Sequence, residues 1–257
     1  MPVDNAMYDR LAATWWEEDA WLNLLRTALN PARFGYLRET VVAHGLEPEG
    51  AAALDVGCGG GLLSEEVARL GFRVTGVDPS GPSLATARAH AQSSGLQIHY
   101  VEGPGEALPV DDAAFDLVFC CDVLEHVDSV PAVLREIRRA LKPGGLFVYD
   151  TINRTPISKL VIIKLFQEWD STRIVEPGLH DYSMFIKPRE LEREMRTARL
   201  EPHGSEGFKP AANPIKLIRL MRARRRGEVG MRDFAAAARM KRTRDRSVSY
   251  LGHAVAV

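Results

Sequence analysis

The chain has 257 residues, 46% of them hydrophobic, and a formal net charge of −1. This is enough apolar sequence for a single domain, residues 1–257, with a substantial core. No apolar run reaches the length of a membrane-spanning helix, and no secretory signal is visible. The three cysteines lack the spacing of a metal finger. We therefore expect a cytoplasmic protein with reduced thiols.

Charge is distributed unevenly along the chain. Residues 216–246 contain twelve Lys or Arg and three Asp or Glu, a local charge of +9, so the remainder carries −10. Such a segment either contacts an anionic partner or forms a solvated helix surface, and both interpretations stay open.

Strand-like and helix-like segments alternate through the middle of the chain. Residues 1–50 are predicted to form a helical cap. The expected strands are then 52–56, 73–77, 98–101, 115–120 and 146–151, and the expected helices are 62–70, 83–92 and 132–141. Five strands alternating with helices predict an α/β fold with a parallel sheet wound on both faces.

Three further segments follow this alternating region. Residues 152–215 interrupt the pattern and are predicted to form a lid over the acceptor. Residues 216–246 are predicted to form a basic helical insertion, and residues 247–257 alternate like a final strand. Ligands of such sheets bind beyond the carboxyl ends of the strands, so we expect the site there.

A glycine-rich turn follows the first predicted strand. Gly57, Gly59, Gly60 and Gly61 allow a sharp turn and the close approach of a ligand. Asp78, at the end of the second strand, is suited to accept hydrogen bonds from ribose hydroxyls. On these residues alone, a nicotinamide dinucleotide would fit as well.

Four ordered motifs follow the predicted strands. They are residues 55–61 (DVGCGGG), 76–78 (GVD), 115–118 (FDLV) and 142–145 (KPGG). Together they resemble the motifs of class I S-adenosylmethionine-dependent methyltransferases. The resemblance implies a doubly wound, mostly parallel, seven-stranded Rossmann-like sheet and S-adenosyl-L-methionine as cofactor. It also implies cofactor-binding roles for Asp55, Gly57, Gly59 and Asp78.

One position departs from that family pattern. Many relatives have an acidic residue after strand three that meets the adenine amine, whereas this chain has Pro104. We expect the backbone near Gly105 and Glu106 to hold the adenine instead.

Further motifs resemble those of the ubiquinone-biosynthesis O-methyltransferase family, which methylates catechol hydroxyls on polyprenylated rings. They are residues 8–12 (YDRLA), 15–16 (WW), 30–36 (NPARFGY), 124–126 (LEH), 153–155 (NRT), 180–181 (HD) and 185–188 (FIKP). The resemblance implies that Arg33 contacts the cofactor, where its guanidinium would suit the methionyl carboxylate. It also implies that Cys121 lies beside the adenine and contacts it through its backbone.

Asp122, Glu125 and His126 follow the fourth predicted strand. On a helical turn they would share one face, where two carboxylates and an imidazole suit a divalent ion such as Mg²⁺. Such an ion would stabilise a phenolate. Alternatively, His126 acts as a general base without metal while Glu125 fixes its tautomer, or the cluster is structural. These three interpretations stay open.

Two segments suggest contact with a membrane surface. Residues 157–169 (ISKLVIIKLFQEW) are predicted to be a core helix, an acceptor lid or an interfacial helix. Residues 222–226 (RARRR) and 239–242 (RMKR) depart from the family and suit anionic lipid headgroups. Nucleic acid is disfavoured because residues 216–246 contain a single aromatic residue, Phe234.

The sequence therefore predicts O-methylation of a phenolic, catechol-like acceptor, with a polyprenylated quinone precursor as the preferred substrate. The alternatives are another phenolic metabolite, a non-catalytic cofactor-binding partner in a quinone-pathway complex, and a nicotinamide-dependent oxidoreductase.

Overall fold

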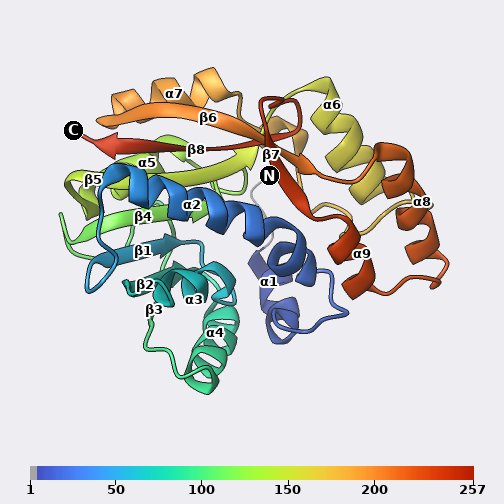
Figure 1. Ribbon diagram of the computed structural model, residues 1–257, viewed down its shortest axis with the longest axis horizontal. Coiled ribbons are helices and arrows are strands. Elements are labelled where there is room, and N and C mark those ends of the chain that lie inside the picture. The colour runs from blue at the N-terminus through green and yellow to red at the C-terminus, as the bar shows by residue number, and fades with distance from the viewer. Residues whose placement is uncertain (1–4) are drawn as a thin grey trace.

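The computed structural model describes residues 5–257, and all of its strands belong to one mixed sheet (Figure 1). Its eight strands lie in the order β3-β2-β1-β4-β5-β8-β6-β7. The five strands from β3 to β5 are parallel, β8 is antiparallel to both β5 and β6, and β7 is antiparallel to β6. The strands are β1 Ala52–Val56, β2 Arg73–Asp78, β3 His99–Glu102, β4 Phe115–Cys121, β5 Leu141–Ile152, β6 Leu200–Pro210, β7 Met240–Thr243 and β8 Ser249–Ala256.

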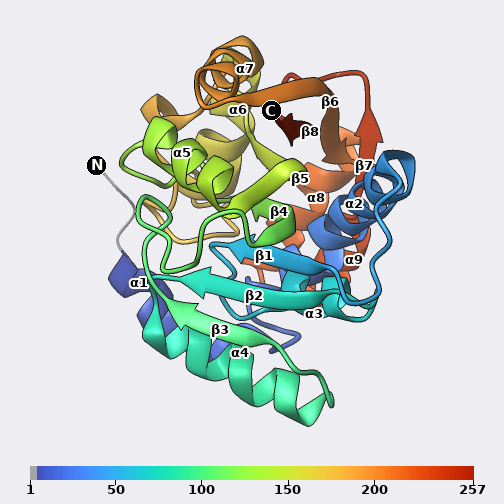
Figure 2. The same cartoon turned by 90° about the vertical axis from the view of Figure 1, so that its left-hand side faces the viewer.

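Helices cover both faces of this sheet (Figure 2). The α-helices are α1 Asn5–Leu11, α2 Asn30–His44, α3 Leu62–Ala68, α4 Gly81–Ser93, α5 Val130–Ala140, α6 Pro156–Ser158, α7 Pro188–Thr197, α8 Pro214–Arg225 and α9 Met231–Ala237. Two short segments are 3-10 helices, η1 Ala12–Thr14 and η4 Tyr182–Met184, and two are π-helices, η2 Leu25–Leu29 and η3 Lys159–Glu168. The doubly wound fold expected from the sequence is confirmed.

Alternation along the buried strands separates two cores. In β1, Leu54 and Val56 pack with residues of α5 and α7, whereas Ala53 packs with residues of α2 and α3. Successive side chains of a strand point to opposite faces, so a continuous apolar strand supplies both cores. β1 is buried on both faces because it is an interior strand, flanked by β2 and β4 and covered by helices on each side.

Several helix ends follow local sequence signals. Ser80 caps α4 by accepting a hydrogen bond from the backbone N–H of Ser83, and Ser129 caps α5 in the same way through Ala132. Gly45 ends α2 with a left-handed φ of 73°. These caps fix where the loops between strands and helices begin, and those loops form the site.

The later segments differ in detail from the sequence-based boundaries. Within residues 152–215, only α6, η3 and η4 stand away from the sheet, because α7 and β6 return to it. Within residues 216–246, β7 pairs with β6 and adds an eighth strand to the seven expected. None of the helices in residues 5–257 combines the length and apolar character that a membrane crossing requires.

Candidate active site

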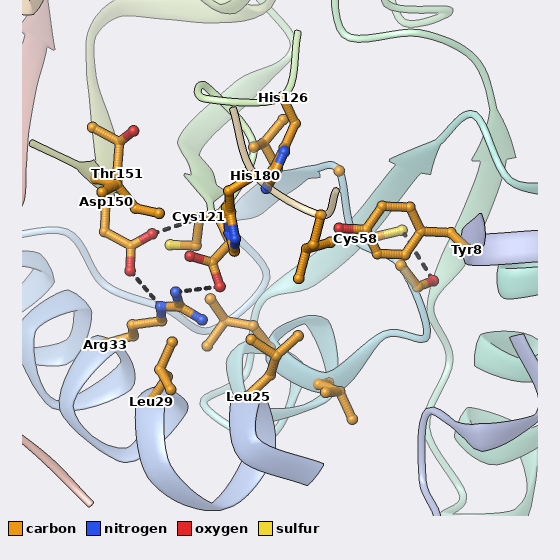
Figure 3. Close-up of a pocket in the computed structure, with 18 of the residues that line it drawn as sticks. Tyr8, Leu25, Leu29, Arg33, Cys58, Cys121, His126, Asp150, Thr151 and His180 are labelled. Atoms are coloured by element: carbon orange, nitrogen blue, oxygen red, sulfur yellow. Dashed lines mark hydrogen bonds and ion pairs between the residues drawn. The ribbon is translucent and has the colours of Figure 1, made fainter. Parts of the chain in front are cut away.

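A cavity of about 380 Å³ lies beyond the carboxyl ends of the parallel strands (Figure 3). All the residues predicted to bind the cofactor line it: Arg33, Asp55, Gly57, Gly59, Asp78, Gly105, Glu106 and Cys121. Asp122 and His126 also line this cavity, whereas Glu125 does not. The parallel sheet thus brings together residues separated by more than ninety positions in the sequence.

The glycine-rich turn forms one end of the cavity. Gly57, Gly59 and Gly61 have φ values of 75°, 51° and 79°, in the left-handed region that favours glycine. The Gly59 N–H donates to Asp78 Oδ2 at 2.8 Å, which ties the end of β1 to the end of β2. Asp55 accepts from Ser64 Oγ at 2.6 Å, and burial raises the pKa of its carboxyl to about 7.

The N-terminal cap closes over this glycine turn. The indole of Trp15 lies against Gly60 so closely that an added Cβ would sit 2.3 Å from its ring. Trp15 Nε1 donates to Ser83 Oγ at 3.0 Å, and Trp16 Nε1 donates to the Gly60 carbonyl at 2.9 Å. Tyr8 also lines the cavity. Tyr8, Trp15 and Trp16 belong to family motifs, but no sequence pattern predicted a place for them in the site.

Arg33 lies between two carboxylates at the centre of the cavity wall. Its Nη2 pairs with Asp122 Oδ2 at 2.6 Å, its Nε pairs with Asp150 Oδ2, and its Nη1 donates to Asn30 Oδ1 at 3.2 Å. Although Arg33 is desolvated, the two carboxylates raise its pKa. Asp150, at the end of β5, was not predicted as a site residue.

The loop after β3 forms the wall expected to face the adenine. Residues 103–106 line the cavity, and the nearest side-chain atoms to a Cβ added at Gly105 would be 3.5 Å away. The Glu106 carboxylate points to another loop, where Oε1 accepts from the Asp128 N–H at 3.0 Å. The Glu106 carboxylate is therefore held by the loop after β4, and the segment 103–106 lines the cavity.

Two histidines face each other across another part of the wall. The rings of His126 and His180 have centroids 5.1 Å apart and planes tilted by 34°. Burial lowers the pKa of His126 to about 4 and that of His180 to about 3, so both rings are neutral near pH 7. His180, which comes from the lid segment, was not predicted as a site residue.

Glu125 is directed away from His126. Its Oε2 accepts from Thr151 Oγ1 at 2.8 Å, and its Oε1 has no hydrogen-bond partner in residues 5–257. Burial, with the nearby charges of Asp122 and Asp150, raises the pKa of Glu125 to about 8. The predicted contact in which Glu125 fixes the tautomer of His126 is therefore not formed.

The remainder of the cavity wall is apolar. Its side chains come from η2, from η3, from the lid loop and from the segment around β7: Leu25, Leu29, Val161, Ile162, Phe166, Leu179 and Met240. An extended apolar group next to the polar site would find favourable burial here.

Comparison with known proteins identifies the family. A methyltransferase domain model matches residues 54–149. A ubiquinone biosynthesis O-methyltransferase of Caulobacter sp. (strain K31) is 40% identical over 222 residues, covering 83% of this chain and 86% of that protein. A ubiquinone biosynthesis O-methyltransferase of Bordetella avium is also 40% identical, covering 84% and 88%.

The chain belongs to the ubiquinone biosynthesis O-methyltransferase family. It is an S-adenosylmethionine-dependent O-methyltransferase. A solved methyltransferase from Thermotoga maritima, described as a possible histamine N-methyltransferase, shares the fold with a TM-score of 0.63 at 17% identity, covering 98% of this chain and 99% of its own. An S-adenosylmethionine-dependent methyltransferase from Aquifex aeolicus gives 0.59 at 14%, covering 99% of both chains.

The residues at the glycine turn fit the cofactor of this family. Left-handed glycines bring the backbone close to the cavity, and the Asp78 carboxylate lies at its edge. The loop 103–106 supplies a second backbone wall. When bound, S-adenosylmethionine supplies an electrophilic methyl group on a sulfonium.

The residues expected to hold a metal ion do not form that site. The Asp122 carboxylate is paired with Arg33, and Glu125 faces Thr151 behind the cavity wall. Within residues 5–257, no group of three or more His, Cys, Asp or Glu side chains is arranged to hold a metal ion. The two carboxylates expected as metal ligands are therefore turned to other partners, and only His126 of the expected set keeps a ring without a hydrogen bond in residues 5–257.

Proposed function

We propose that this protein methylates a phenolic oxygen of a catechol ring that carries an apolar tail, as a step in quinone biosynthesis. The observation that carries the proposal is the cavity itself. It joins a cofactor turn, two neutral imidazoles and an apolar wall within one enclosed space. Those three features match, in turn, the methyl donor, the ring hydroxyls and the tail of such an acceptor.

The cofactor would be held by the residues that follow β1, β2 and β3. Gly57 and Gly59 admit the methionyl part, while Asp55 supports the turn through Ser64. Asp78 suits the ribose hydroxyls, and the backbone at Gly105, Glu106 and Cys121 suits the adenine.

We propose a different task for Arg33 from the expected contact with the methionyl carboxylate. Two carboxylates surround its single positive charge, so the cluster is net negative and favours the ammonium group of the cofactor over its carboxylate. Arg33 then acts indirectly, because it positions the carboxylates of Asp122 and Asp150. This assignment follows from the net charge of the three side chains. It keeps Arg33 beside the methionyl part of the cofactor.

His126 is the proposed general base. Its ring lines the cavity, makes no hydrogen bond in residues 5–257 and is neutral near pH 7, so a nitrogen lone pair is free to accept from a phenol. The burial that keeps the ring neutral also makes it a weak base in this structure. His126 would take the proton of the phenol. Bound S-adenosylmethionine would supply the methyl group to the resulting phenolate oxygen, and its sulfonium would become a thioether.

A His126→Phe variant tests this function. We expect methylation of a catechol with a short prenyl chain to fall about 10²-fold or more, because a general base contributes roughly that factor. Binding of S-adenosylhomocysteine should stay unchanged by calorimetry. The control is His99→Phe, since His99 is exposed on β3 and does not line the cavity. Turnover of amines but of no phenol by the native protein would overturn the proposal.

We also propose that the protein docks peripherally on the anionic inner face of the membrane. Apolar side chains of the lid are exposed, with Ile157 51%, Leu160 48% and Trp169 47% accessible. Arg225 Nε donates to the Asp170 carbonyl at 2.8 Å, which places the end of α8 beside Trp169. A basic helix adjoining exposed apolar side chains suits a lipid headgroup boundary.

One stripe of α8 carries the exposed charge. Ile215, Arg219, Arg222 and Arg226 are spaced at one helical face, and all four are exposed. Arg226 pairs with Glu228, whereas Arg219 and Arg222 make no ion pair within residues 5–257. These two arginines are therefore available to phosphate groups.

Sedimentation with vesicles tests the docking. We expect Arg219→Glu with Arg222→Glu to weaken binding to vesicles containing phosphatidylglycerol by more than tenfold, at about 1 kcal/mol per charge. Arg193→Glu, at an exposed position of α7, is a charge-reversal control away from α8 and should bind normally. Equal binding of all three proteins to anionic and neutral vesicles would contradict the role of α8.

A further inference from the structure

His180 lies on the lid segment between η3 and η4, and its ring projects into the same cavity as His126 (Figure 3). Nothing in the family motifs assigned it a task. The two rings come from segments more than fifty residues apart, one after β4 and one in the lid. Their centroids are nevertheless 5.1 Å apart. The fold therefore places a second imidazole beside the proposed base.

The lid fixes the position of His180 through its backbone. The buried side chain of Gln167, on η3, accepts from the His180 N–H through Oε1 at 2.7 Å. Its Nε2 donates to the His180 carbonyl at 3.0 Å. The ring itself meets Phe185 edge-on, with centroids 6.2 Å apart. These contacts hold the ring in place without using its nitrogens.

Both imidazoles have unused hydrogen-bonding capacity. Nδ1 of each ring is fully enclosed and has no partner in residues 5–257. The Nε2 atoms also make no hydrogen bond there but are not enclosed, so they are the nitrogens that a ligand in the cavity can reach. Polar groups inside a protein are normally paired, and an unpaired one is a cost that a bound ligand can remove.

Two such nitrogens suit two neighbouring oxygens. Because the ring centroids are only 5.1 Å apart, the two Nε2 atoms would reach two adjacent hydroxyls of one acceptor side by side, each over a hydrogen bond of about 2.8 Å. A single hydroxyl would leave one imidazole without a partner. Such a pair of nitrogens would favour an acceptor with two adjacent hydroxyls over one with a single hydroxyl.

We propose that His180 binds the hydroxyl that is not methylated while His126 faces the reacting one, so that the lid histidine selects catechols over monophenols. The proposal rests on the phenolic O-methylation argued above. His180 contacts the acceptor and takes no proton from the reacting oxygen. Removing it should reduce discrimination without removing the chemistry.

The test combines a change in the protein with a change in the acceptor. The acceptors are a catechol with a short prenyl chain and the matched phenol that lacks the second hydroxyl. For the native protein, we expect kcat/KM to favour the catechol. In His180→Phe, which keeps a ring against Phe185, kcat/KM for the catechol should fall about tenfold, as for one lost hydrogen bond. Its value for the monophenol should change less than twofold.

A second variant distinguishes recognition from packing. His180→Asn keeps a donor and an acceptor, so it should recover part of the preference for catechol that His180→Phe loses. Binding of S-adenosylhomocysteine should be the same in all three proteins. An equal loss of kcat/KM for both acceptors in His180→Phe would overturn the proposal, because it would show a structural role. Failure of the native protein to methylate either phenol would instead overturn the proposed function.

Discussion

The cofactor end and the acceptor end of the cavity differ in how their polar groups are satisfied. At the cofactor end, Asp55 accepts from Ser64, and Asp78 accepts from the backbone of Gly59 and Ser80. At the acceptor end, the rings of His126 and His180 have no hydrogen-bond partner in the described chain. The first region is preorganised by its own contacts, whereas the second is completed by its ligand.

The two regions also differ in how the chain builds them. The cofactor end comes mainly from residues 55–83, which contain the end of β1, helix α3, strand β2 and the start of α4, and it is closed by the N-terminal cap. The acceptor end combines η2, the loop after β4, η3, the lid loop and the segment around β7. Most of the proposed cofactor site thus comes from one stretch of the chain, with residues 103–106 and Cys121 added from later loops, whereas the proposed acceptor site combines segments that can vary independently.

The largest effect is expected where the two ends meet, at Arg33. Arg33→Leu leaves Asp122 and Asp150 facing each other without a cation, and breaking such a buried pair costs about 3–5 kcal/mol. Urea unfolding at pH 7 measures this loss. Arg232→Leu, which removes an exposed pair with Glu18, should cost less than about 1 kcal/mol. Similar losses of unfolding free energy in the two variants would show that Arg33 does not stabilise the junction between the two ends of the cavity.

The next effect concerns the packing of the cap on the cofactor end. Gly60→Ala would place a Cβ 2.3 Å from the Trp15 ring, so the indole must move. We expect a loss of about 1–3 kcal/mol in stability, as for other overpacked sites, together with weaker binding of S-adenosylhomocysteine. Thermal unfolding and calorimetry measure the two quantities.

Gly35→Ala provides the matched control for Gly60→Ala. Gly35 lies inside α2, and nothing lies within 4 Å of its added Cβ. Alanine should therefore stabilise the helix by about 0.5–1 kcal/mol and leave the cofactor affinity unchanged. If Gly60→Ala binds S-adenosylhomocysteine as tightly as Gly35→Ala, then Trp15 does not belong to the cofactor end.

The cofactor end is also the region that the sequence predicted well. The strands and turns around Asp55, Gly57, Gly59 and Asp78 follow from short apolar runs and glycines, which are local signals. Tyr8, Trp15, Asp150 and His180 enter the cavity through tertiary contacts, so no local pattern marks them as site residues. Their presence within or beside family motifs was the available signal.

The prediction about Glu125 shows where spacing misleads. Asp122, Glu125 and His126 share one face only if the segment is helical. In the structure, Asp122 has a left-handed φ of 57°, and the segment forms turns. This conformation directs Asp122 to Arg33 and leaves Glu125 facing Thr151. The shared metal face therefore disappears.

The last prediction concerns the ionisation of Glu125. Its pKa is raised by burial to about 8, above its ordinary value of 4.5. The stability that depends on its proton is fully present below pH 4.5 and is lost as pH rises through 8, because the unfolded chain releases that proton first. Glu125→Gln stays neutral and can still accept from Thr151. Between pH 5 and pH 8.5, the difference in unfolding free energy should therefore shift in favour of Gln by at least about 1.4 kcal/mol, the equivalent of one pKa unit.

Urea unfolding at pH 5 and pH 8.5 measures this shift, with Glu136→Gln as the control. Arg139 holds the pKa of Glu136 below its ordinary value, so Glu136 stays ionised across this range and its substitution should give a difference that does not vary with pH. A constant difference for Glu125→Gln as well would mean that the Glu125 carboxylate is ionised in the folded protein. It would then add a negative charge behind His126 and favour the imidazolium form. The acceptor end would then contain charged groups, as the cofactor end does, and would no longer differ from it by being neutral.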